Sequence, residues 1–215
     1  MIWVTFGNLR LRRNTGLFLT LGGVLGSAFG LWLYLRSARG GVLSATGASV
    51  TGTFYLRTQP IYLQADPNWA GERIGRSGRR FRRAGSAVCC LSMALAHHGV
   101  DLDPGALNAA LTVRDGYARD GRVRWPAVAR VTDGRAAARG ISVPTHAIVR
   151  AAIQSGNPVA ARVRLPAGGE HWVLLVGWRG GGYLMKDPLG DGKGVDPLTR
   201  YGSDIHEVWI VEKGQ

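Results

Sequence analysis

The sequence predicts an α+β domain with an antiparallel sheet, and two observations lead to that fold class. Candidate helices fill the first part of the region after residue 53, and candidate strands fill the last part. The strands follow one another through short glycine-rich turns, as in hairpins, whereas a parallel sheet needs a helical crossover between strands. A third observation, a long uncharged segment near the N-terminus, predicts one transmembrane helix ahead of the domain.

The composition excludes several classes of protein. The chain has 215 residues, of which 46% are hydrophobic and 19% charged, so we expect a packed core and not a disordered chain. Its formal net charge is +13, and 24 of its 27 basic residues are arginine, which together with 32 glycines is typical of a GC-rich bacterial genome. The two cysteines, Cys89 and Cys90, are neighbours and poorly placed to pair, which excludes a disulfide-rich secreted scaffold.

The uncharged segment covers the twenty residues from Gly16 to Leu35. As a helix rising about 1.5 Å per residue, it spans a hydrocarbon core of roughly 30 Å. We therefore expect a transmembrane helix over 16–36. More arginines precede the segment than follow it, so we expect the basic N-terminus over 1–15 to be cytoplasmic. A cleaved signal peptide is the alternative, but its hydrophobic region would be overlong and no small-residue cleavage site follows. The sequence therefore predicts a single-pass protein of the inner (plasma) membrane, with its globular domain periplasmic or extracellular.

Glycines mark one face of this segment. Gly22, Gly26 and Gly30 recur at every fourth residue, and such a stripe lets a second helix approach closely. We expect a helix–helix contact there, although glycine is common throughout the chain. Residues 37–52 are small and polar and predict a flexible linker, so the folded domain is expected over 53–215.

Helices are predicted by apolar runs with start and stop signals. Ala87–His97 is strongly apolar, has the length of a helix and ends before Gly99. Asp103 and Pro104 form a good N-cap and first turn for a short helix that reaches about Leu111. Two further short helices are expected, over 125–131 and from Pro144 to about Gly156.

Strands are predicted where apolar residues lie between turns. Residues 53–63 alternate enough to form a strand, and Pro60 would keep that strand at an edge of the sheet. The other strands are expected over 159–165, 171–178, 183–186 and 207–211.

Three features bear on chemistry. A run of small residues from Gly85 and Ser86 opens the apolar helix, and a helix N-terminus lowers the pKa of a thiol or stabilises an oxyanion. His171 begins one apolar strand and Asp187 ends the next, so the turn between the strands brings both to the same end of a hairpin. A base that is oriented by a carboxylate and faces a helix N-terminus is the layout of nucleophilic catalysis, although a lone strand histidine is more often structural.

Four segments carry a family resemblance. They are Y-L-Q-A-D-P-N-W from Tyr62, A-G-S-A-V-C-C-L-S-M-A-L-A-H-H-G from Ala84, G-E-H-W-V-L-L-V-G-W from Gly169 and Y-L-M-K-D-P-L-G-D-G from Tyr183. In this order they resemble the papain-like cysteine peptidases, and most of all the bacteriocin-processing peptidases that cut after a double-glycine leader. The resemblance covers nearly all of residues 55–212 and implies a papain-like fold, in which a central helix packs on an antiparallel sheet. It also implies that His171 is the general base, Asp187 its orienting acid and Gln64 the oxyanion-hole glutamine.

The nucleophile position departs from the family pattern. The family has a cysteine directly after Gly85, and this chain has Ser86. A thiol pKa near 8.5 can fall to about 3.5–7.5 beside a helix N-terminus and a histidine, but a serine hydroxyl lies far above that range and forms no standing ion pair. Cys89 and Cys90 lie about one turn further along the helix, inside an apolar run typical of buried structural thiols. We therefore expect severe loss of peptidase activity.

The sequence leaves two functions open, and a third class, a purely structural anchor with a vestigial cleft, cannot be told from the first of them. One is a membrane-anchored pseudopeptidase that acts as a binding or accessory subunit of a membrane complex, with a peptide or protein as its partner. The other is an active papain-like peptidase outside the cytoplasm that uses Ser86 or a displaced cysteine. No cofactor is expected, and the histidines have no zinc-type spacing with the cysteines, so no metal is expected either.

A basic run precedes the candidate nucleophile. Glu72–Arg83 contains six arginines and one glutamate, and it could hold an acidic peptide, anionic lipid headgroups or nucleic acid, or be a solvated loop. Phe81 is its only aromatic residue, which is little for a base-stacking surface. On a domain outside the cytoplasm, nucleic acid is not the expected partner.

Overall fold

The structure is a computed structural model, and it describes residues 42–47, 52–57 and 60–214. All of these belong to one compact unit, Gly41–Gln215. The predicted N-terminal segment over 1–15, the transmembrane helix over 16–36 and its glycine stripe lie outside the described residues. Among the helices of the described ranges, none has both the length and the apolar character that a bilayer crossing needs.

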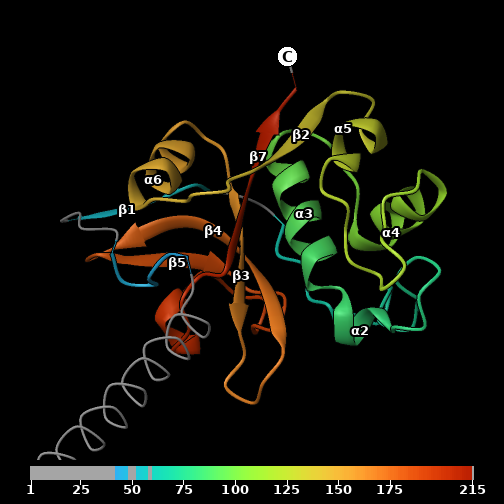
Figure 1. The fold of residues 1–215 in the computed structure, drawn as a ribbon, viewed down its shortest axis with the longest axis horizontal. Coiled ribbons are helices and arrows are strands. Elements are labelled where there is room, and N and C mark those ends of the chain that lie inside the picture. Colours follow the sequence, from blue (N-terminus) through green and yellow to red (C-terminus); the bar gives the residue numbers. More distant parts are fainter. Residues whose placement is uncertain (1–41, 48–51, 58–59, 215) are drawn as a thin grey trace, which may run out of the picture. The chain divides into compact units, whose positions relative to one another are not determined.

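An antiparallel sheet of seven strands runs through the domain, in the order β2-β7-β3-β4-β5-β6, with β1 beside β4 (Figure 1). Every strand pair in it is antiparallel, as the hairpin pattern of the sequence predicts. The strands are β1 (Thr53–Tyr55), β2 (Ala136–Gly140), β3 (Val159–Arg164), β4 (Glu170–Arg179), β5 (Gly182–Lys186), β6 (Asp196–Pro197) and β7 (Glu207–Lys213).

Helices cover both faces of this sheet (Figure 1). On one face α3 packs against β4, α4 packs on α3, and α5 packs on β2; Leu174 and Val176 of β4 point into this core. On the other face α6 packs against β3 and β4, and Val173 and Leu175 point into that second core. Because both faces are buried, β4 is apolar along nearly its whole length. The helices are α2 (Phe81–Ala84), α3 (Ser86–His97), α4 (Pro104–Val113), α5 (Ala127–Val131), α6 (His146–Gln154) and the 3₁₀ helix η1 (Leu198–Tyr201).

The predicted helices form for the physical reasons that the sequence suggested. In α3 every residue from Ser86 to Leu95 is buried, as expected for a helix that is apolar all round. In α4 the Asp103 side chain accepts a hydrogen bond from the Ala106 N–H at 2.8 Å, which is the N-cap contact. Thr145 caps α6 in the same way through the Ile148 N–H, at 3.2 Å.

The strand predicted over 53–63 is shorter than expected, since only Thr53–Tyr55 forms β1. β5 occupies one side of β4, so β1 and β3 must share the other side. β3 pairs with β4 as far as Leu175, and β1 pairs with it from Gly177 onward. The room that a longer β1 would need is therefore already taken by β3.

The linker prediction is wrong for residues 42–47, which pack onto the domain. Leu43 and Ala45 are buried in the core that contains α6, and Leu43 exchanges two backbone hydrogen bonds with Ile205, of 3.2 and 2.8 Å. Alternating exposure places Val42 and Ser44 outward. Although the segment is mostly small and polar, Leu43 and Ala45 lie two residues apart, as the buried side chains of a strand do. The compact unit therefore starts before residue 53.

Replacing Leu43 tests this packing. Leu43→Ala is expected to lower the free energy of unfolding by about 2 kcal/mol or more, because removing a buried leucine side chain loses apolar burial and leaves a cavity. Urea unfolding of the full chain, followed by tryptophan fluorescence, measures the change. Val42→Ala is the matched control, since Val42 is 54% exposed and its truncation should change stability by no more than about 0.5 kcal/mol. Equal effects of the two substitutions would mean that this segment does not pack.

Candidate active site

Ser86 is the first residue of α3 and lies at the bottom of a groove. Gly85 precedes it, and a Cβ on Gly85 would lie 2.2 Å from the ring of the fully buried Phe81, so only glycine fits there. The amide groups of the first turn of α3 have no helical acceptors, and they make this end of the helix electropositive. The Ser86 Oγ accepts a hydrogen bond from the Trp172 N–H of β4 at 3.3 Å. The helix start is thereby held against the strand that carries His171.

His171 and Asp187 meet as the hairpin argument predicts. His171 lies near the start of β4, Asp187 directly follows β5, and the His171 Nε2 is 2.7 Å from the Asp187 Oδ1. Both side chains are buried. Since the ionised carboxylate only accepts hydrogen bonds, the imidazole Nε2 carries a proton toward it. In the neutral ring, Nδ1 is then the basic nitrogen.

The Asp187 carboxylate is held by more donors than the sequence indicates. The Leu189 N–H donates to its Oδ1 at 2.8 Å, and the Tyr201 O–H donates to its Oδ2. Arg200 lies further away, with its Nη1 3.7 Å from Oδ2. Burial opposes ionisation, but the hydrogen bonds from His171, Tyr201 and Leu189 prevail and lower the pKa of Asp187. Asp187 is therefore a buried anion at neutral pH.

Tyr201 is a site residue that the sequence analysis missed. It belongs to η1, and its ring lies edge-on to that of His171, with 5.6 Å between the ring centroids. Burial and the hydrogen bond to Asp187 both raise the pKa of its phenol, so it stays a donor. A short 3₁₀ turn has no strong sequence pattern, and this tyrosine has no spacing that links it to Asp187.

Gln64 lies in the same groove as Ser86 and His171. Its N–H donates to the Pro188 carbonyl at 3.0 Å, and its side-chain Nε2 donates to the Arg82 carbonyl at 2.8 Å. These two contacts fix Gln64 between the loop after β5 and the end of α2. One Nε2 hydrogen remains for the groove, and the buried Oε1 has no hydrogen-bond partner in the described part of the chain. The fold thus brings Gln64 into the same groove as Ser86 despite their distance in sequence. The oxyanion role of Gln64 stays a prediction.

The two cysteines do not reach this groove in a reactive form. Cys89 and Cys90 belong to α3, and both are fully buried in the core. Burial raises the pKa of both thiols well above the ordinary value. A thiolate is the reactive form of cysteine, so neither residue is placed to replace Ser86. Among the described residues, no group of three or more His, Cys, Asp or Glu side chains is arranged to hold a metal ion.

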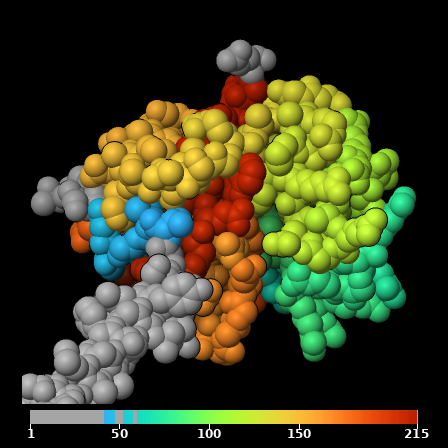
Figure 2. All heavy atoms as spheres, in the orientation of Figure 1, coloured from blue at the N-terminus to red at the C-terminus, as the bar shows by residue number. Residues whose placement is uncertain are grey.

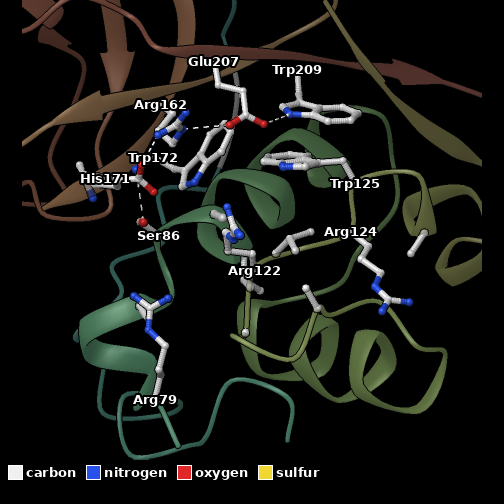
Figure 3. Close-up of a pocket in the computed structure, with 18 of the residues that line it drawn as sticks. Arg79, Ser86, Arg122, Arg124, Trp125, Arg162, His171, Trp172, Glu207 and Trp209 are labelled. Carbon is white, nitrogen blue, oxygen red and sulfur yellow. Dashed lines mark hydrogen bonds and ion pairs between the residues drawn. The ribbon is translucent and has the colours of Figure 1, made fainter. Parts of the chain in front are cut away.

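The groove around Ser86 has a volume of about 1010 Å³ and walls of two chemical kinds (Figure 3). Three tryptophans form one wall. Trp125 stacks on Trp209 with ring planes 10° apart, and the ring centroids of Trp172 and Trp125 are 4.9 Å apart. Glu207 accepts a hydrogen bond from the Trp209 indole N–H at 2.7 Å and one from Arg162 at 2.9 Å. Arginines line much of the remainder.

Comparisons with known proteins give a structural likeness. No family model and no curated protein matches the chain. Among solved structures, one described as a C39-like peptidase from Bacillus anthracis is similar, with a TM-score of 0.49 and 14% sequence identity. The similarity covers 76% of this chain and all of that one.

Tyr201→Phe tests whether the phenol holds Asp187 ionised. The native pKa of Asp187 is lowered, so its ionisation adds stability above the unfolded pKa of about 3.9, and this is lost as the pH falls further. Removing the donor should therefore lower the free energy of unfolding at pH 7 by about 1.5–3 kcal/mol, the value of a hydrogen bond to a charged group.

The difference between the parent and Tyr201→Phe should shrink below about pH 4, where the carboxylate becomes protonated first in the unfolded chain and then, at lower pH, in the folded one. Urea unfolding at a series of pH values measures it. Tyr55→Phe, at an exposed tyrosine, is the control and should show little change at any pH. A stability loss of the same size from pH 7 to pH 3 would contradict the assignment.

Proposed function

We propose that the chain is a pseudopeptidase, a peptidase-like domain that holds a peptide in its groove as a binding or accessory subunit of a membrane complex and does not cleave it efficiently. The single observation that carries the proposal is the hydroxyl of Ser86 at the start of α3, where the chemistry of the surrounding groups calls for a thiolate. His171, Asp187 and Gln64 are arranged around the same groove or directly behind it.

The reason is the acidity of the nucleophile. A thiol beside an imidazole and a helix N-terminus gives up its proton before attack, and the resulting ion pair is ready to react. The Ser86 hydroxyl must lose its proton during attack, so it needs a direct hydrogen bond to the base. Within the described residues, Ser86 Oγ bonds to the Trp172 N–H and makes no hydrogen bond to His171. The hydroxyl is therefore neither acidic nor engaged with its base.

An active peptidase is the second candidate, and a specific observation favours it. His171 and Asp187 form a fully buried pair that Tyr201 and Leu189 support, so the base is oriented as catalysis requires. Apo sites often tighten their catalytic hydrogen bonds only when substrate binds. A serine hydrolase built from Ser86, His171 and Asp187 is thus the alternative that the experiment must separate from a binder.

Ser86→Cys is the decisive substitution. We expect the parent full chain to leave a mixture of peptides intact and the variant to cleave it, with a gain of at least about 100-fold, because the cysteine can use the base that is already in place. Mass spectrometry of the peptides after incubation measures the cleavage. His171→Ala in the Ser86→Cys background should abolish it.

Alkylation of the thiols gives a readout that does not depend on the choice of substrate. The parent should react slowly with iodoacetamide, since both of its cysteines are buried, and Ser86→Cys should gain one reactive thiol that His171→Ala slows. Cleavage by the parent that His171→Ala stops would overturn the pseudopeptidase and establish the active alternative. A reactive new thiol in Ser86→Cys without any cleavage would leave only a vestigial groove.

We also propose that residues 16–36 anchor the chain in the inner membrane, with the domain outside the cytoplasm and Gly22, Gly26 and Gly30 facing a second helix. The support is the uncharged segment and its flanking arginines. The full chain in cells should sediment with membranes, resist extraction by alkaline carbonate and be cleaved by a protease added outside the inner membrane. Release by carbonate, or protection from that protease, would contradict the anchor or the orientation respectively.

A further inference from the structure

The groove around Ser86 carries an excess of positive charge. Seven arginines line it, against three acidic residues, Asp115, Glu170 and Glu207. All three acidic residues are already used: Asp115 pairs with Arg124 at 2.6 Å, and Glu170 and Glu207 both pair with Arg162. The groove itself therefore has no carboxylate left for its other arginines.

Some of these remaining arginines find acidic partners outside the groove and some do not. Arg114 pairs with Asp133, and Arg122 with Asp120, each at 2.6 Å. Arg79, Arg83 and Arg130 have no ion pair within the described part of the chain. An arginine is always charged and presents a planar set of donors that fits a carboxylate, so this unmatched set indicates an anionic ligand.

Two of the unmatched arginines lie at the Ser86 end of the groove. Arg83 belongs to α2, which ends just before Gly85, and Arg79 lies in the turn that leads into α2. The Arg79 side chain extends from that turn toward Ser86 (Figure 3). Together with the electropositive start of α3, they make the neighbourhood of Ser86 the part of the groove best suited to a negative group.

The shape and the aromatic residues favour a peptide over a lipid surface or nucleic acid. The cationic site lies in a hollow between the β3–β4 hairpin and the α2–α3 region, which a flat membrane does not enter (Figure 2). Phe81, the only aromatic residue of the basic run, is fully buried and offers no face to a base. Trp125 is buried, and the half-buried Trp172 and Trp209 present only part of their rings to the groove. An extended peptide can enter the hollow and place side chains against both walls.

We propose that the groove selects acidic peptides, with a glutamate or aspartate of the bound segment paired to Arg79 and Arg83 beside Ser86 and an apolar side chain on the Trp172 and Trp209 wall. This inference rests on the proposed function and names the chemical class of its ligand. It gives the basic run of the sequence a role in the groove itself, where long arginine side chains also supply apolar contact along their stems.

Binding of two labelled decapeptides to the full chain tests the proposal. The peptides share the same leucines, and one has glutamates where the other has glutamines. Fluorescence anisotropy at low salt should give at least about 10-fold tighter binding of the acidic peptide, a preference that high salt reduces. The double substitution Arg79→Glu and Arg83→Glu should remove the preference, and Arg79→Gln with Arg83→Gln should remove most of it without reversing charge near α2.

Arg76→Glu is the matched control. Arg76 is exposed and belongs to the same basic run, but it does not line the groove. Arg76→Glu changes the net charge by the same amount as either Arg79→Glu or Arg83→Glu does. It should alter binding by no more than about twofold. If Arg76→Glu lost as much affinity for the acidic peptide as the groove variants do, the preference would come from general charge attraction, and the proposal would be overturned. Circular dichroism of each variant checks that the domain still folds.

The remaining outcomes separate this inference from the proposed function. Equal binding of the acidic and neutral peptides overturns the inference and leaves the peptide-binding function standing. Failure of both peptides to bind, together with no cleavage by Ser86→Cys, overturns both. Phosphatidylglycerol vesicles or a single-stranded oligonucleotide could instead bind more tightly than the acidic peptide and lose that binding in the Arg79 and Arg83 variants. This result would assign the site to lipid or nucleic acid and overturn the proposal of a peptide ligand.

Discussion

The buried carboxylate of Asp187 is the constraint on which the rest of the site depends. A charge removed from water is tolerated only where donors surround it, and here the donors come from β4, from the loop after β5 and from η1. Satisfying Asp187 therefore fixes His171, Leu189 and Tyr201 relative to one another. Through the Pro188 carbonyl the same loop also holds Gln64, so the groove residues His171, Leu189 and Gln64 are all tied to the surroundings of one buried charge.

This network is complete without a charge at position 86. A cysteine there would form a thiolate opposite an imidazolium, and Asp187 would orient that cation. Ser86 offers a neutral hydroxyl there instead, and this hydroxyl accepts the Trp172 N–H. The hydrogen bonds around His171 and Asp187 are thus complete beside a hydroxyl that makes no hydrogen bond to His171 within the described residues. In the proposed function, this one position separates holding a ligand from cleaving it.

The parts that the sequence predicted are those set by local patterns. Asp103 caps α4 as predicted, and the hairpin that unites His171 with Asp187 follows from adjacent strands joined by a glycine turn. Contacts set by the tertiary fold were not predictable in this way. β2 joins the sheet through β7, far along the chain, and its run of alanines has weak strand propensity. Leu43 likewise gains its place only by meeting Ile205.

The charge of the groove bears on the choice between a binder and an enzyme. Ion pairs between arginines and a ligand carboxylate form when the ligand binds and do not strengthen as a peptide bond breaks, so they add affinity without lowering the barrier. Such contacts mainly slow release of what is bound. For a peptidase this would retard product departure, whereas a holding domain gains directly from it. Arginines that have no ion pair among the described residues, beside a weak nucleophile and an oriented base, fit a groove that retains an acidic segment better than one that turns it over.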